Sequence, residues 1–154
     1  MFNGGVSLVC SGSAVWHRKI QISDDMRIVA YEATMMAKLT IEDGRGPVYC
    51  RAFWTGMDEV DALGDVPTGF GKGSFADIAS GNRIRWEVKW YLDPNSKYRG
   101  LFTFTSGTGE WKGVSGELDA ALEFCTLHED DLQTEDAPLQ VLGFVEGFGS
   151  ISLP

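Results

Sequence analysis

Strict alternation of apolar and polar side chains over one long segment is the feature that most constrains how this chain can fold. Between residues 29 and 41 every odd position is apolar or aromatic, whereas the even positions are mostly polar. The odd positions are Val29, Tyr31, Ala33, Met35, Ala37, Leu39 and Ile41. Because side chains alternate between the two faces of a β-strand, the pattern predicts a long strand with one buried face. An α-helix would mix the two sets, so the pattern excludes one.

The same period of two recurs along the chain, and turn sequences separate the segments that carry it. It is clearest after residue 82, where Ile84, Trp86, Val88 and Trp90 alternate with charged neighbours. The predicted strands cover residues 13–22, 29–41, 48–57, 69–78, 83–92, 98–105, 117–124 and 141–153, and residues 58–68 are predicted to form a loop or a single helical turn. Short connections imply antiparallel neighbours, and closing such a sheet removes its edges. We therefore predict an all-β fold, with residues 1–154 forming a single antiparallel β-barrel of about eight strands.

A glycine-rich stretch, residues 106–116, joins two of the predicted strands. Gly107, Gly109, Gly113 and Gly116 allow a tight bend there, and Trp111 is the one bulky side chain available to cover it. We expect a β-corner at this point. Such a stretch says more about the fold than about an activity.

The Gly-Thr-Gly at residues 107–109, the aromatic Trp111 and the Gly-Val-Ser-Gly at 113–116 resemble a late-strand signature of the allene oxide cyclase barrel superfamily. That superfamily includes dirigent proteins and small bacterial barrel proteins. Residues 69–75 followed by 81–84, and residues 145–151, fit the same picture in order. The resemblance spans residues 66–153. It implies a barrel that acts on a small hydrophobic substrate without a cofactor and that forms dimers or trimers.

Charge and cysteine content limit the partners and the compartment. A net charge of −9 would repel nucleic acid and anionic membrane surfaces, so we expect neither as a partner. The three cysteines, Cys10, Cys50 and Cys125, are odd in number and include no CxxC pair. No basic segment precedes the first apolar patch, so a signal peptide is not expected. We therefore expect reduced thiols and a cytoplasmic location.

The interior of an eight-stranded barrel is just wide enough to be filled by side chains or to hold one small ligand. Large aromatic residues would fill it, whereas Ala33, Ala37, Ala120 and the glycines at 71 and 73 would remove volume. The sequence leaves the filled and the hollow interior equally open. If the barrel is hollow, the expected ligand-binding residues are Met35, Trp54, Trp86, Trp90, Phe102, Phe104 and Phe124.

Few polar residues are candidates for chemistry in such an interior. Tyr31 shares a face with six apolar residues, and Tyr49 is the next candidate, so both are proposed as catalytic. His17 lies on the polar face of the first strand and His128 in an acidic loop, and neither has a Cys, Asp or Glu at ligand spacing on a defined element, so no metal is expected. The glycines at 69, 71 and 73 lie in a strand pattern that leads into no helix, which excludes a dinucleotide fingerprint, and no cofactor is expected.

Three functions remain open. The first is a cofactor-free cyclase or isomerase that folds a small hydrophobic substrate into one conformer inside the cavity. The second is a non-catalytic barrel that binds a lipophilic small molecule. The third is a filled barrel with a role in assembly. Apolar side chains on both faces of the strand at 48–57 favour a homo-oligomer in each case, because a second copy would cover its outer face.

Overall fold

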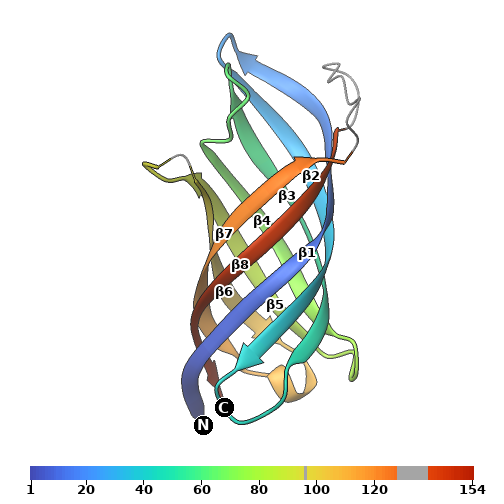
Figure 1. The fold of residues 1–154 in the computed structure, drawn as a ribbon, viewed down its shortest axis with the longest axis vertical. Coiled ribbons are helices and arrows are strands. Elements are labelled where there is room, and N and C mark those ends of the chain that lie inside the picture. Colours follow the sequence, from blue (N-terminus) through green and yellow to red (C-terminus); the bar gives the residue numbers. More distant parts are fainter. Residues whose placement is uncertain (96, 128–138) are drawn as a thin grey trace.

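The computed structural model describes residues 1–95, 97–127 and 139–154. Eight antiparallel strands form a closed barrel in which each strand pairs with the next and β8 pairs with β1 (Figure 1). The elements are β1 (Phe2–Ser23), β2 (Met26–Ile41), β3 (Val48–Asp61), β4 (Thr68–Asp77), β5 (Arg83–Leu92), β6 (Tyr98–Gly107), the 3₁₀ turn η1 (Gly109–Trp111), β7 (Ser115–Thr126) and β8 (Leu139–Leu153). The predicted all-β antiparallel barrel is confirmed.

The side-chain alternation sets which residues face the interior. On β2 the odd residues from Val29 to Ile41 are buried and the even ones are exposed, as the sequence predicts. On β5 the even residues Ile84, Trp86, Val88 and Trp90 are buried in the same way. The pairing register of neighbouring strands places their inward-facing residues next to one another, so one continuous apolar surface lines the inside of the barrel.

Most strands are longer than the sequence pattern predicts, and β1 and β3 extend furthest beyond the expected residues. β1 begins at Phe2 because it pairs with β8 from Phe2 onward, and glycines and serines are tolerated where both edges of a strand are hydrogen-bonded. β3 does not end at Met57 but continues to Asp61, pairing with β2 up to Asp61 and Met26. The prediction of a loop from residue 58 is therefore wrong for residues 58–61. Their acidic side chains suggest solvent, but the backbone still completes the sheet.

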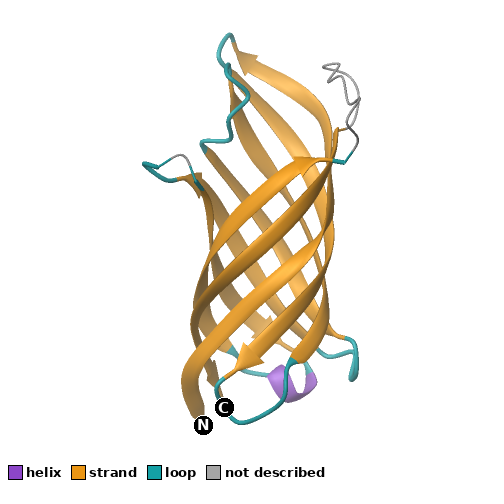
Figure 2. Cartoon of the chain, in the orientation of Figure 1, coloured by secondary structure: helices purple, strands orange, loops and turns teal. Residues whose placement is uncertain are grey.

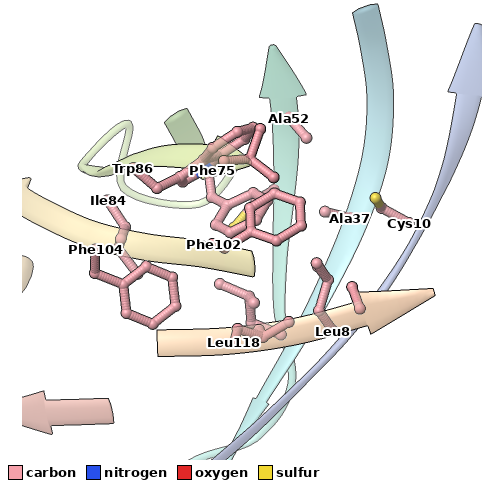
Figure 3. Packing of buried hydrophobic residues seen from close by; sticks show 14 of the residues in the cluster. Leu8, Cys10, Ala37, Ala52, Phe75, Ile84, Trp86, Phe102, Phe104 and Leu118 are labelled. Carbon is pink, nitrogen blue, oxygen red and sulfur yellow. The ribbon is translucent and has the colours of Figure 1, made fainter. Parts of the chain in front are cut away.

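Both chain termini lie at one end of the barrel (Figure 1), and the buried side chains towards that end are closely packed (Figure 3). Trp86, Phe75 and Phe102 are each 1% exposed, and the Trp86 and Phe102 ring centroids are 4.7 Å apart in an edge-on contact. Ile84, Leu118 and Leu8 fill the remaining space around these rings. Aromatic pairs at this spacing add stability beyond the area they bury.

The glycine-rich stretch closes this packed end. η1, the single helical turn in Figure 2, places the Trp111 side chain in the barrel core, where it is 1% exposed. A side chain at Gly107 would collide with Trp111, which explains why glycine stands there. The Arg45 guanidinium lies 4.8 Å above the Trp111 ring and also contacts Glu110. The expected corner is observed, and its tryptophan seals the barrel.

The outer surface of β2 to β4 carries exposed apolar side chains. Tyr49, Phe53 and Met57 of β3 are 53%, 44% and 43% exposed, and Met36 of β2 and Phe70 of β4 flank them. The two apolar faces expected of this strand are thus present. That a second copy of the chain covers the outer face stays a prediction. Among the residues that the structure describes, no helix is long and apolar enough to cross a bilayer.

Candidate functional site

The opposite end of the barrel, away from the termini, contains a cavity. It lies where β1, β3 and β7 end, and its volume is about 50 Å³. Its walls are almost entirely apolar. They consist of the aromatic residues Trp16, Tyr31, Trp54, Trp90, Tyr98 and Phe124, the small residues Ala14, Ala33 and Gly143, the aliphatic residues Met35, Val66, Leu122 and Val141, and Asp58.

Small residues on two adjacent strands leave space for the hollow, because Ala14 of β1 pairs with Ala33 of β2. Gly143 of β8, opposite Gly12 of β1, also lines the cavity, and the end of the Met35 side chain lies against it. None of these residues can reach the barrel axis. The sequence leaves a filled and a hollow interior equally open, and the structure shows both: the barrel is filled at one end and hollow at the other.

Tyr31 lines the cavity, as predicted, but its hydroxyl is already engaged. It donates a hydrogen bond to the Phe70 carbonyl oxygen at 3.2 Å and accepts one from Trp90 Nε1 at 3.2 Å. Gly56 and Gly71 leave the space that this hydroxyl occupies. Burial raises the pKa of Tyr31 well above its ordinary value, and the nearby Asp58 charge raises it further. Tyr31 is therefore a neutral, fixed part of the wall, and its catalytic role stays a prediction.

Asp58 is the acidic residue at the cavity, and it is not among the site residues predicted from the sequence. It is 6% exposed, and its Oδ1 has no hydrogen-bond partner among the described residues. Burial raises the pKa of the carboxyl group from 3.8 to about 7. Gly69 of β4 makes the space for it, since a side chain there would collide with Oδ1. A buried carboxyl group with a pKa near neutrality, beside an apolar cavity, is a candidate functional group.

Period two could have revealed Asp58. The inward positions of β3 are Cys50, Ala52, Trp54, Gly56, Asp58 and Val60. The predicted strand ends at Met57, so Asp58 and Val60 are not predicted to face the interior. The glycines of β4 make room for neighbouring groups: the Asp58 side chain lies against Gly69, the Tyr31 hydroxyl against Gly71, and the β3 backbone at Phe53 against Gly73.

The structure divides the predicted ligand-binding residues into two groups. Met35, Trp54, Trp90 and Phe124 line the cavity. Trp86, Phe102 and Phe104 face inward too, but they do not line it because they lie in the packed core, where they are 1%, 1% and 4% exposed.

Tyr49 does not face the interior. It lies on the outer surface of β3, 53% exposed, because Cys50, Ala52 and Trp54 take the inward phase of that strand. The prediction that Tyr49 contributes to a site inside the barrel is corrected accordingly. Both faces of β3 carry aromatic residues, so the sequence could not settle the phase.

The cysteines and histidines contribute no site within the described residues. Cys10 and Cys50 are buried, and burial raises the pKa of each thiol to about 12, so neither is a reactive thiolate. No group of three His, Cys, Asp or Glu that could hold a metal ion occurs in the described part of the chain. His128 and the acidic segment that it begins lie outside the described residues.

No protein-family model matches the sequence, and no curated protein matches it. A solved structure to which this chain is similar is that of a pterocarpan synthase dirigent protein. The two share 11% sequence identity with a TM-score of 0.40, over 96% of this chain and 86% of that chain. The closed eight-stranded antiparallel barrel is the kind of fold that the sequence resemblance implies.

Proposed function

We propose that this protein binds a small hydrophobic molecule in the cavity and acts on it as a cofactor-independent cyclase or isomerase. The observation that carries the proposal is the cavity itself. A fully packed barrel would carry larger side chains than those of Ala14 and Ala33, which pair with each other and line the cavity. Apolar walls with one or two placed polar groups are typical of sites for small molecules.

The chemistry proposed is conformational templating. A flexible substrate held in one reactive shape has already lost the entropy that it would otherwise lose in the transition state, which lowers the barrier by up to several kcal/mol. Asp58 would exchange a proton with the substrate, because a pKa near 7 suits both a donor and an acceptor at neutral pH. Tyr31 would hold the wall in shape through its contacts with Phe70 and Trp90.

A non-catalytic binding barrel is the second candidate. One observation favours it: the hydroxyl of Tyr31, one of the few polar groups at the cavity, is already hydrogen-bonded to Phe70 and Trp90. Among the described residues that line the cavity, Asp58 is then the ionisable one that keeps an oxygen without a hydrogen-bond partner. The two candidates share the cavity and differ in turnover.

A cavity-filling substitution tests the proposal. Ala33→Leu puts three additional carbon atoms into the hollow, whereas Ala30→Leu makes the same change at an exposed position of the same strand. The probes are neutral: toluene, cyclohexanol and 1-naphthol. Binding is read from the fluorescence of the cavity tryptophans and from saturation-transfer NMR. We expect the unaltered protein and Ala30→Leu to bind at least one probe, and Ala33→Leu to lose that binding.

The second half of the test concerns any molecule that travels with the protein. Native mass spectrometry of the purified protein, followed by denaturing extraction, identifies its chemical class, and incubation with that class shows whether product forms. Product formation that Asp58→Asn abolishes supports the enzyme. Binding without product supports the second candidate. If the neutral probes bind and Ala33→Leu binds them as tightly as Ala30→Leu does, the proposed cavity function is wrong.

A further inference from the structure

We propose that the ligand of this cavity carries a positive charge, as a protonated or quaternary ammonium group, and that the Asp58 carboxylate is its counter-ion. This inference rests on the proposed function, since it assumes that the cavity holds a small molecule. It adds the charge of that molecule, which neither the fold nor the resemblance specifies.

The first argument is the composition of the walls. Six of the residues that line the cavity are aromatic. Three of them form one cluster, in which the Phe124 ring centroid lies 5.3 Å from that of Trp16 and 5.2 Å from that of Tyr98. An organic cation over the face of Trp or Tyr is attracted by the ring quadrupole, and the attraction grows when water is excluded. Aliphatic walls would enclose a neutral apolar ligand equally well, but they would give a cation nothing.

The second argument is the uncompensated carboxyl group. Asp58 is only 6% exposed, and its Oδ1 has no hydrogen-bond partner among the described residues. The described residues that line the cavity include no Lys, Arg or His. Lys89 borders Asp58 on the outer surface and does not line the cavity, so ionised Asp58 presents a negative charge to an apolar space whose described lining holds no cation. A buried charge of this kind is costly unless it is paired, and an ammonium ligand would pair it.

The third argument excludes the other charge and weakens the neutral alternative. An anionic ligand would meet the Asp58 charge inside and a chain of net charge −9 outside. A neutral alcohol could donate one hydrogen bond to Oδ1, but it would leave the charge in place and gain little from the six rings. The cation is the ligand class that uses both the rings and the carboxylate.

A pair of isosteric probes tests the inference. Choline and 3,3-dimethylbutan-1-ol have the same shape, but choline has a quaternary nitrogen where the alcohol has a carbon. Their affinities are measured by calorimetric titration at pH 8, above the pKa of Asp58, with ionic strength held constant by NaCl. We expect choline to bind at least about tenfold more tightly than the alcohol.

Variants show which groups carry the preference. Asp58→Asn should reduce choline affinity at least about tenfold and leave the alcohol within about twofold, whereas Glu59→Gln, at the exposed neighbouring position, should change neither. Trp16→Leu, which keeps Asp58 and removes one ring, should weaken choline more than the alcohol. This second variant keeps the inference testable if Asp58→Asn fails to fold by circular dichroism.

The outcomes separate the two proposals. If the alcohol binds as tightly as choline and Asp58→Asn changes neither, the cation is wrong while the cavity function stands. If the alcohol, choline and the neutral probes all fail to bind, the proposed function fails, and this inference fails with it. A choline preference that Asp58→Asn and Trp16→Leu both reduce supports the assignment.

Discussion

The two ends of the barrel use the same strands for opposite purposes. At the end with the chain termini, Trp86, Phe102 and Trp111 are each 1% exposed and fill the interior. At the other end the same alternation places Ala14 and Ala33 side by side, and the interior stays hollow. Stability is therefore expected to reside in the packed end. The hollow end is left free to carry a group such as Asp58, which a stable core would not tolerate.

This division predicts that equivalent truncations at the two ends differ in cost. Phe102→Ala should destabilise the fold by about 3–5 kcal/mol, because the cavity it leaves is surrounded by packed rings. Phe124→Ala, at the partly exposed wall of the hollow end, should cost less than half as much. Urea denaturation of the two variants measures both values. Equal costs would mean that the hollow end contributes as much to the fold as the packed end.

Asp58 should make the hollow end pH-sensitive. A carboxyl group whose pKa is raised in the folded protein binds its proton more tightly there than in the unfolded chain. The fold is therefore stabilised at low pH, and that stability is lost as the pH rises from 3.8 to about 7. Above pH 7 both states are ionised and the effect is constant. The difference corresponds to at most about 4 kcal/mol.

The measurement compares the unaltered protein with Asp58→Asn, whose amide does not titrate. Between pH 4 and pH 7.5 the variant should gain stability relative to the unaltered protein. Tyr31 faces Asp58 from β2 but stays neutral over this range, and Glu59 and Lys89 border Asp58 on the outer surface. Glu59→Gln, which removes the neighbouring acidic group on the outer surface, serves as the control. A flat difference across this range would show that Asp58 is ionised normally in the folded protein.

The smallest expected effect concerns the Tyr31 hydroxyl. Tyr31→Phe should cost about 1–3 kcal/mol, because it leaves the buried Trp90 Nε1 and the Phe70 carbonyl oxygen without this partner. Tyr49→Phe, on the outer face, should change stability by less than about 0.5 kcal/mol. Thermal unfolding followed by circular dichroism distinguishes the two. If both variants behave alike, the Tyr31 hydrogen bonds do not contribute to the wall.

Most of the fold could be predicted from the sequence because period two is local. The strand at 83–92 has the predicted bounds, since its charged and apolar residues alternate without a break. Which face of a strand points into the barrel is harder to predict where both faces are apolar, and for that reason the predicted inward position of Tyr49 is wrong. The end of a strand is harder still, because Asp58 and Glu59 resemble a loop when their pairing with β2 and β4 is not visible.

The hollow end could not be predicted because it depends on register. Ala14 and Ala33 come from two strands, and only the pairing of β1 with β2 brings them side by side. Trp86 and Trp90 both face inward from β5 and belong to the core cluster, yet only Trp90 also lines the cavity. A difference of four residues along the strand decides between them.

The buried Trp111 side chain bears on how a ligand reaches the cavity. Because this side chain and the packed rings fill the end with the chain termini, we expect a ligand to enter and leave by the opposite end of the barrel. Under the proposed turnover, product and substrate would then share one route, so an accumulated product should compete directly with substrate.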